Sequence, residues 1–139
     1  MWVNAQVKCS GRLNLPQSTF VVHEHWASHH HYDFRLEMDG VLKSWAVPKG
    51  PPEVKGIRRL AIAVEDHDLQ YGSFEGEIPE GEYGAGKVSI WDTGNYELKL
   101  REPRKITFEL HGSKLRGEYE LILMREEKGR QLWLLFKKS

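Results

Sequence analysis

Residues 31–47 contain two strand-like segments joined by Asp39-Gly40. Polar and apolar side chains alternate up to Met38, and a second apolar-patterned segment runs from Val41 to Val47. An Asp-Gly pair between such segments favours a type I′ turn, because both central residues of that turn need positive φ angles. The sequence therefore predicts a β-hairpin here, with an antiparallel sheet built around it.

The rest of the chain repeats this pattern of short strand-like segments separated by turn residues. Besides a strand that starts at 20–22 and runs into a histidine cluster, we predict strands at 60–64, 87–91, 96–101, 106–110, 118–124 and 131–136. The intervening segments include a Pro-rich loop at 48–52, a glycine-punctuated stretch at 72–86 and a turn at 92–95. No segment has a convincing helical pattern of two turns. The spacing predicts an all-β fold, an antiparallel barrel or sandwich with at most short helices.

We expect one domain, residues 19–139, preceded by a loosely attached lead-in, residues 1–18, with at most one short strand. A chain of 139 residues can bury enough surface to fold without a disulfide or metal staple. No apolar run approaches the roughly 20 residues that span a bilayer, and the first residues lack a secretory signal. Together with the single cysteine, Cys9, these features favour a cytoplasmic protein with no membrane partner.

The charge balance limits the kinds of partner that the chain can bind. The sequence has 20 basic and 20 acidic residues and a formal net charge of zero. Coating a nucleic acid duplex requires the neutralisation of many phosphates at once, so this balance argues against that class of function. A local basic pocket remains compatible with it, since Lys43, Lys49, Lys55, Arg58 and Arg59 are close in sequence.

A histidine-rich stretch from His23 to Arg35 holds five of the seven histidines. In an extended strand alternate side chains share a face, which places His31, Asp33, Arg35 and Glu37 on one side and Tyr32, Phe34, Leu36 and Met38 on the other. One face is apolar, while the other carries an imidazole, a carboxylate and a guanidinium in a row. This pattern indicates a functional site.

His25, His31 and Asp33 would together supply two imidazoles and one carboxylate. Such a set suits a divalent transition ion and leaves positions open for water and substrate. The strand fixes the spacing of His31 and Asp33, whereas His25 must return through a turn. Two alternatives remain on the residues alone: a polar surface loop that captures metals adventitiously, and the facial triad of a non-haem iron oxygenase.

Arg35 lies on the same predicted face, and its planar guanidinium matches a carboxylate or phosphate group. A structural ion pair with an acidic side chain is the alternative. His67 could complete an anion site and donate a proton, or lie exposed in a turn. An extended strand would place His67 with Arg59 and Glu65, opposite Leu60, Ile62 and Val64. Tyr71 is most simply a packing residue, and Trp26 either packs or stacks on a nucleobase.

Three stretches carry a resemblance to a known family: FVVHEHWASHHHYDFRLEMDGVLKSWAVPKGP, RLAIAVEDHDLQYGSFEGEIPEGEYGAGKVSIWDTGNYE and GSKLRGEYELILMREEKGRQLWLLFKK. They span Phe20 to Lys138, and the first two are long and specific. On these residues the chain resembles the 3′-phosphoesterase module of the bacterial end-joining ligase D and its stand-alone archaeal relatives.

The resemblance implies a compact β-barrel with its site on a concave surface, and a manganese-dependent enzyme that trims DNA 3′ ends. A phosphodiesterase step removes a terminal ribonucleoside and leaves a 3′-phosphate, which a phosphomonoesterase step converts to a 3′-hydroxyl. By motif position His25, His31 and Asp33 would hold Mn²⁺, or another ion such as Co²⁺ or Zn²⁺. Arg35, His67 and Tyr71 would be catalytic, Lys49 and Arg59 would bind substrate, and Glu65 would support the site.

Two departures qualify these expectations. The family often has glutamine where this chain has His23, a position expected to support the site. An imidazole there would alter the balance of the two activities or bind a second ion. The chain also includes no ligase or polymerase domain, so we expect a monomer that meets separate ligase, polymerase and end-binding proteins at DNA 3′ ends. A catalytically silent module that binds DNA ends or single strands is the main alternative function.

Overall fold

The computed structural model describes residues 18–82 and 85–139, and these contain nine β-strands, one 3₁₀ helix and no α-helix. The elements are β1 (Ser18–Trp26), β2 (His30–Met38), β3 (Val41–Val47), β4 (Arg58–His67), η1 (Leu69–Ser73), β5 (Gly76–Ile78), β6 (Gly86–Glu102), β7 (Lys105–His111), β8 (Arg116–Glu127) and β9 (Arg130–Lys137). The predicted all-β class is confirmed. The predicted lead-in lies, apart from Ser18, outside the described residues.

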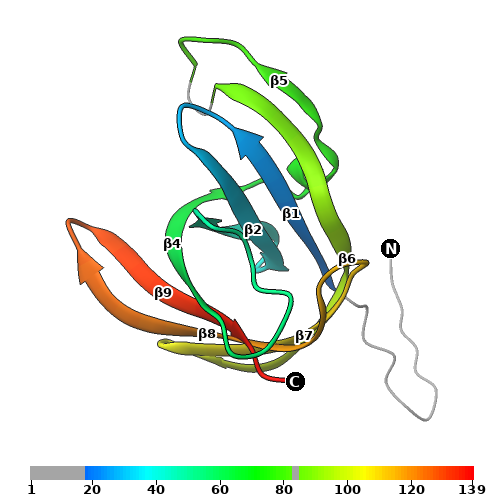
Figure 1. Ribbon diagram of the computed structural model, residues 1–139, viewed down its shortest axis with the longest axis vertical. Coiled ribbons are helices and arrows are strands. Elements are labelled where there is room, and N and C mark those ends of the chain that lie inside the picture. Colours follow the sequence, from blue (N-terminus) through cyan, green and yellow to red (C-terminus); the bar gives the residue numbers. More distant parts are fainter. Residues whose placement is uncertain (1–17, 83–84) are drawn as a thin grey trace.

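Eight of these strands close into an antiparallel barrel. Their order around the barrel is β1-β2-β3-β4-β9-β8-β7-β6, and β6 pairs with β1 to complete the circle. The short strand β5 adds to one end of β6, which extends past the rest of the barrel as an arm (Figure 1). The barrel is thus confirmed over the sandwich. Among the described residues no helix is both long enough and apolar enough to cross a membrane.

The predicted hairpin joins β2 to β3. Asp39 and Gly40 have φ angles of 59° and 79°, as a type I′ turn requires. This turn sets the register between β2 and β3, so each β2 side chain points either into the barrel or to its outer face. Phe34 and Leu36 are fully buried in the barrel interior, whereas Asp33 lies on the opposite face of the same strand.

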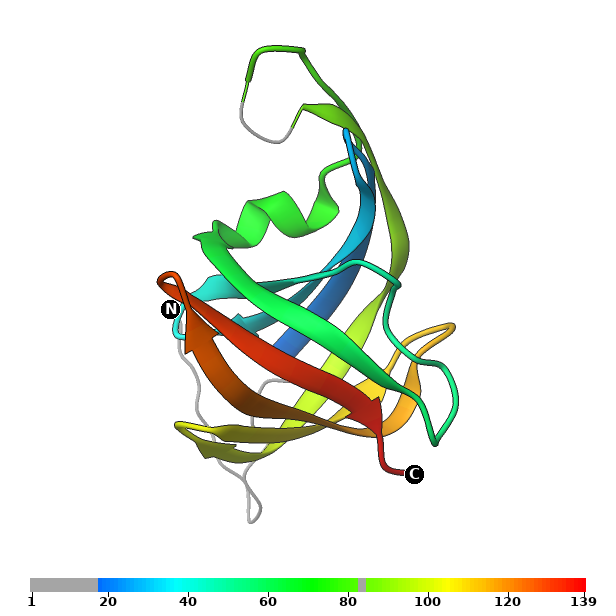
Figure 2. The same ribbon diagram turned by 60° about the vertical axis from the view of Figure 1, so that its left-hand side comes forward.

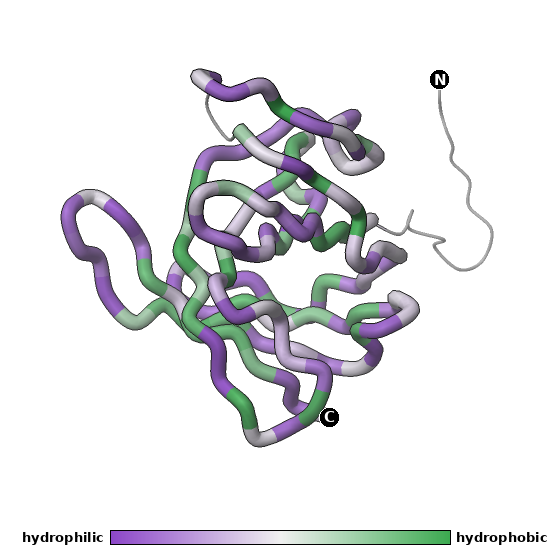
Figure 3. Tube along the Cα trace, turned by 45° about the horizontal axis from the view of Figure 1, so that its top comes forward, coloured by the Kyte–Doolittle hydropathy of each residue, from purple (hydrophilic) through white to green (hydrophobic). Residues whose placement is uncertain are grey.

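The barrel interior is filled mainly by aromatic and branched aliphatic side chains, with the small Ala61 as the contribution of β4. Rings stack through its centre, with Phe34 and Phe108 centroids 5.8 Å apart and Phe108 and Tyr119 centroids 6.4 Å apart. Burying one large apolar side chain stabilises a fold by about 1.5–3 kcal/mol. Figure 3 shows the hydrophobic segments inside and a hydrophilic tip on the β8–β9 hairpin at the left. This packed interior leaves the outer face of the wall as the place for polar chemistry.

The prediction of two strands separated by a turn at 92–95 was wrong, because these residues continue β6 and pair with β1. Gly94 is needed for close approach, since a Cβ there would collide with the backbone carbonyl of His111. The carboxylate of Asp92 accepts backbone hydrogen bonds from Thr93 and from residues 113, 114 and 115. Turn-forming residue types here serve contacts with a distant part of the chain.

The outer face of β1 and β3 is covered by η1. Gly72 lies where a Cβ would contact Leu42 and Val21 at 3.6 and 3.8 Å, and both of those side chains are buried. Figure 2 shows the green helical turn lying outside the barrel wall. η1 therefore forms one wall of a space whose floor is the polar face of β1 and β2.

Candidate metal and phosphate site

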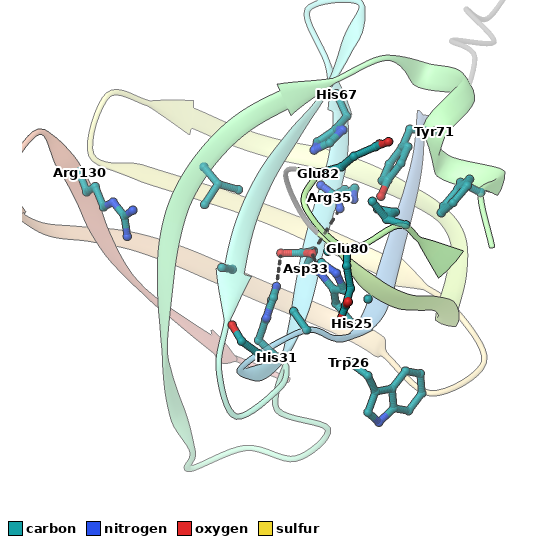
Figure 4. Close-up of a pocket in the computed structure, with 18 residues that line it drawn as sticks. His25, Trp26, His31, Asp33, Arg35, His67, Tyr71, Glu80, Glu82 and Arg130 are labelled. Atoms are coloured by element: carbon teal, nitrogen blue, oxygen red, sulfur yellow. Dashed lines mark hydrogen bonds and ion pairs between the residues drawn. The ribbon is translucent and has the colours of Figure 1, made fainter. Parts of the chain in front are cut away.

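A cleft of about 1280 Å³ lies on the outer face of β1, β2, β3 and β4. Its other walls come from η1, from the β5–β6 arm and from the start of β9. The polar side chains predicted from the sequence point into it, namely His25, His31, Asp33, Arg35, His67 and Tyr71 (Figure 4). The concave surface implied by the family resemblance is this cleft.

The three predicted metal ligands come together at one end of the cleft. His25 and His31 are direct cross-strand partners of β1 and β2, and Asp33 follows two residues later on the same face. Asp33 Oδ1 lies 3.4 Å from His31 Nε2, and Asp33 Oδ2 lies 3.7 Å from His25 Nδ1. All three potential ligand atoms lie within 4.8 Å of one another.

The donor chemistry of this group fits a divalent transition ion. His31 Nδ1 donates to the backbone carbonyl oxygen of His29 at 2.9 Å, so Nε2, which faces Asp33, is the nitrogen that would bind an ion after it loses its proton. Such a hydrogen bond to the outer nitrogen is the usual way in which a ligand histidine is oriented. His25 and Asp33 are buried, which shields the group from water.

Asp33 is ionised in this setting. Burial alone would raise its pKa, but the hydrogen bond with His31 and the positive charge of Arg35 outweigh burial, and the pKa is lowered. The same hydrogen bond raises the pKa of His31. An ionised carboxylate between two imidazoles is the electrostatic arrangement that favours a cation.

Arg35 is 3% exposed, yet it lines the same cleft. Its Nη2 donates to Asp33 Oδ2 at 3.3 Å, its Nη1 donates to Ser44 Oγ at 2.8 Å, and its Nε donates to His23 Nδ1 at 3.0 Å. Ser44 in turn donates to the carbonyl oxygen of Leu42. Three separate elements therefore hold the guanidinium rigidly beside the potential metal group.

His23 has a role that the sequence did not reveal. Its Nδ1 accepts from Arg35, so the proton is on Nε2, which donates to the carbonyl oxygen of Phe74 at 3.1 Å. Burial, followed by the charge of Arg35, lowers its pKa to about 4. Both ring nitrogens are thus engaged, and the expectation that His23 binds a second ion does not fit. The neutral imidazole positions Arg35.

Tyr71 and His67 form the wall opposite the metal group. Their rings stack with centroids 4.4 Å apart, Tyr71 also stacks on Phe74 at 5.1 Å, and the Arg35 guanidinium lies over the Tyr71 ring at 4.9 Å. Burial is the main factor that lowers the pKa of His67, with the charge of Arg35 second, and it raises the pKa of Tyr71. His67 is therefore neutral near pH 7.

The predicted face of His67 was wrong. Ser44 pairs with Val64 while Leu42 pairs with His67, so β4 has one extra residue between these pairs. This bulge reverses the alternation and turns His67 into the cleft together with Val64. The face predicted to be polar instead includes Ala61, which is fully buried in the core.

Three residues expected at the site lie outside the cleft lining. Lys49 is exposed in the loop after β3, and Glu65 is exposed on β4. Arg59 lies near the start of β4, where alternation puts it on the face of Ala61 rather than of Val64. Lys49, Arg59 and Glu65 are thus not brought together with the metal group by this fold.

The cleft also contains charged residues that the sequence did not single out. Glu80 and Glu82 line it from the β5–β6 arm, and Arg130 lines it from the β8–β9 hairpin. Figure 4 shows Arg130 well apart from the two glutamates. Because these residues are exposed and come from distant segments, no local pattern identifies them.

The geometry agrees with the comparison of this chain with known proteins. Residues 23–123 match the family described as the DNA ligase D 3′-phosphoesterase domain. The chain is 53% identical over 109 residues to the multifunctional non-homologous end joining DNA repair protein LigD of Mycobacterium tuberculosis, which covers 76% of this chain and 14% of the relative. It is 47% identical over 138 residues to LigD of Pseudomonas aeruginosa, covering 92% of this chain and 16% of the relative.

The similarity thus involves one segment of much longer proteins. LigD of Mycolicibacterium smegmatis has the same relation, with 48% identity over 126 residues, 83% of this chain and 16% of the relative. The matched residues include His25, His31, Asp33 and Arg35. By sequence and by the placement of these residues, the chain belongs to the family of DNA ligase D 3′-phosphoesterase domains.

Proposed function

We propose that this protein is a manganese-dependent phosphoesterase that heals DNA 3′ ends. Its phosphodiesterase step removes a 3′-terminal nucleoside, preferentially a ribonucleoside, and its phosphomonoesterase step converts the resulting 3′-phosphate into a 3′-hydroxyl. The single observation that carries the proposal is that Asp33 contacts both the two histidines of the potential metal group and Arg35. One phosphate can therefore reach a metal ion and a guanidinium together.

Arg35 is the group that binds the scissile phosphate. Its partners hold the guanidinium in one orientation, so its charge is already in place when negative charge builds on the phosphate oxygens. Preorganised charge of this kind lowers a barrier because no reorganisation is needed at the moment of reaction. Burial strengthens the effect, since Arg35 is only 3% exposed.

His67 and Tyr71 face the same position from the opposite wall. A neutral His67 can donate one N–H to a phosphate or leaving oxygen, and the ring of Tyr71 keeps His67 in place by stacking. The Tyr71 hydroxyl stays protonated because its pKa is raised, so it acts as a donor. Both residues thus stabilise the developing negative charge.

His25, His31 and Asp33 would hold the divalent ion. The ion supplies positive charge at the phosphate and lowers the pKa of water, which makes hydroxide available near neutral pH. We propose Mn²⁺, with Co²⁺ and Zn²⁺ as substitutes, because a set of two imidazoles and one carboxylate is suited to all three.

The proposed substrate is one strand end and not a length of duplex. A net charge of zero gives no broad positive surface, whereas a cleft with a buried arginine can hold a terminal phosphate. The relatives are named as end joining proteins. We propose that this protein acts as a monomer on ends that ligase, polymerase and end-binding activities then use.

The test is incubation of the protein with a 5′-labelled DNA strand that ends in one ribonucleotide. With Mn²⁺ we expect first a shortened 3′-phosphate product and then its 3′-hydroxyl form, resolved by electrophoresis. Asp33→Asn is the inactive variant, and Lys55→Ala, in an exposed loop, is the matched control.

Three results would count against the proposal. Binding of the strand with no product at any ion concentration would make the protein a silent binding module. Turnover that needs both iron and oxygen would make it an oxygenase. Products from Asp33→Asn at the wild-type rate would remove the proposed metal group from the reaction.

A further inference from the structure

A chain of aromatic rings begins beside the cleft and continues along β2 and β6. Trp26 stacks on His30 with ring centroids 5.5 Å apart and an interplanar angle of 12°. His30 contacts Tyr32 at 5.3 Å, and Tyr32 contacts Trp91 at 5.5 Å. These rings come from three adjacent strands, β2, β1 and β6, which lie side by side in Figure 1.

A lysine lies at each end of this chain of rings. Lys87 Nζ is 5.4 Å from the centre of the Trp26 ring, and Lys114 Nζ is 5.0 Å from the centre of the Trp91 ring. Both lysines are exposed. We call the set of Lys87, Trp26, His30, Tyr32, Trp91 and Lys114 the aromatic strip.

Packing in the barrel does not account for the whole strip. Tyr32 and Trp91 rest partly on the core, but Trp26 is 41% exposed and His30 is exposed as well. The half-buried carboxylate of Glu24 lies 2.8 Å from His30 Nε2 and accepts from the Tyr32 hydroxyl at 3.3 Å. Glu24 thus fixes two rings at the surface, an arrangement that a merely solvated face does not need.

The chemistry of the aromatic strip matches single-stranded nucleic acid. Flat rings offer faces for bases whatever the sequence, and lysines at both ends offer charge to the phosphates. Lys87 and Trp91 are four positions apart along β6, which corresponds to about 13 Å of strand. This length suits several unpaired nucleotides, whereas duplex DNA hides its base faces inside the helix.

The strip meets the cleft at its edge, through Trp26, while His30 and Tyr32 lie on the face of β2 opposite His31 and Asp33. Trp26 directly follows the potential ligand His25 in β1 and is one of the residues that line the cleft. Figure 4 shows its ring pointing away from His25, His31 and Asp33. A strand whose terminal phosphate lies by Arg35 would therefore meet Trp26 with the nucleotides that precede its end.

We propose that the aromatic strip binds the unpaired nucleotides on the 5′ side of the strand end held in the cleft. The identity of that strand rests on the proposed function, whereas binding of single-stranded nucleic acid by the strip does not. The strip makes affinity depend on the length of the unpaired strand, with bases stacked on the Trp26 and His30 rings and phosphates at Lys87 and Lys114.

Binding is measured first, by fluorescence anisotropy of a labelled strand of about 12 nucleotides, with a chelator to prevent turnover. We expect Trp26→Ala to weaken binding at least about fivefold, the lower range for loss of one base–aromatic stack. Trp26→Phe should recover most of that loss. Lys87→Ala and Lys114→Ala should each reduce the slope of log affinity against log salt by about 0.7, the value for one contact to a single strand.

Lys55→Ala is the matched control, because this exposed lysine lies in the loop before β4, outside the strip. Wild-type affinity and salt slope in Trp26→Ala and Lys114→Ala would overturn the proposal, provided that their circular dichroism shows folded protein. Weaker binding in these variants would support single-strand binding by the strip even if the protein cleaved no substrate. The binding measurement and the cleavage assay therefore test the two proposals separately.

Turnover identifies the strand. The ratio of kcat/KM for the long strand to that for a dinucleotide with the same 3′ end should fall at least about threefold in Lys114→Ala. An unchanged ratio would overturn the assignment to the cleaved strand. The assignment would also be overturned if Lys114→Ala changed turnover only on substrates whose unpaired nucleotides belong to the strand that is not cleaved.

Discussion

Asp33 and Asp92 are both buried carboxylates on barrel strands, but they have different partners. Asp92 is 4% exposed and accepts hydrogen bonds from four backbone N–H groups, three of them in the turn between β7 and β8. Asp33 is 7% exposed and faces the side chains of His25, His31 and Arg35. Their depth is nearly equal, and their surroundings differ completely.

The comparison shows how burial of the same group can serve two purposes. Backbone donors cannot titrate or leave, so Asp92 joins two distant segments permanently. The partners of Asp33 are imidazoles and a guanidinium that line an open cleft, so a ligand can reach them. A buried acid surrounded by ionisable side chains is the better indication of function.

The largest effect is expected for the stability of Asp92→Ala. Without the carboxylate, four N–H groups of the barrel end lose their acceptor, and each orphaned buried group costs about 1–3 kcal/mol. Three of the four bonds are only part-buried, so we expect a loss at the low end, roughly 3–5 kcal/mol in the free energy of unfolding, measured by urea denaturation. Arg101→Ala is the control, because it removes only an exposed ion pair with Asp39, and such pairs contribute little to stability. Equal losses in both variants would contradict the structural role of Asp92.

The opposite pattern is expected for Asp33→Asn. Removing the charge abolishes the cation site, so activity on a 3′-phosphate strand should fall by more than about 100-fold, beyond the loss typical of an outer partner of a metal ligand. The free energy of unfolding of the ion-free protein should change by less than about 2 kcal/mol, since desolvation of the carboxylate offsets much of its attraction. A stability loss as large as that of Asp92→Ala would remove the contrast between the two carboxylates.

Local patterns predicted the parts of the fold that depend on near neighbours. The Asp39-Gly40 hairpin and the alternation along β2 follow from residues adjacent in sequence. The continuity of β6 does not, because the acceptor at Asp92 and the close approach at Gly94 serve a turn about twenty residues later. Read alone, the segment 92–95 has the composition of a turn.

The site residues also fall into two groups, those predicted from neighbouring positions and those whose roles depend on distant contacts. Asp33 and Arg35 were predicted because i and i+2 share a strand face, and His25 joins them through the hairpin register. The face of His67 depends on a bulge that no local pattern shows. The role of His23 requires Phe74, which is 51 residues away. Local sequence thus gives the chemistry on one strand, and the fold decides what comes to meet it.

Arg35→Lys tests whether the guanidinium acts through its geometry or only through its charge. A lysine keeps the positive charge but cannot donate to Asp33, Ser44 and His23 in one plane. We expect kcat to fall about 100-fold, near the lower end for loss of one preorganised donor, with KM much less affected. Steady-state kinetics on the 3′-phosphate strand provides the measurement. Near-normal kcat would remove Arg35 from its assigned role.

The stability of the barrel should also depend on pH through a buried tyrosine that takes no part in the proposed site. Tyr96 is 2% exposed and donates to the Glu37 carbonyl oxygen at 2.6 Å, and its burial raises its pKa to about 12. The unfolded phenol ionises near pH 10, so stability is full below that pH and is lost as the pH rises toward 12. The wild-type advantage over Tyr96→Phe in urea denaturation should therefore shrink by about 1.4 kcal/mol between pH 8 and pH 11. A constant difference between the two proteins would contradict the raised pKa.

The smallest effect on catalysis is expected at His23, which connects the cleft to the backbone without touching substrate. His23→Leu removes the acceptor for Arg35 and should lower kcat about tenfold, near the lower end for the loss of one hydrogen bond to a charged group. A glutamine can accept from Arg35 through its oxygen and donate to the Phe74 carbonyl through its amide, so His23→Gln should stay within about twofold of wild type. A simple packing role predicts the reverse sensitivity, with both variants changing stability and neither changing kcat. Equal kcat in His23→Leu and His23→Gln would therefore mean that Asp33 and Ser44 hold the guanidinium in place without His23.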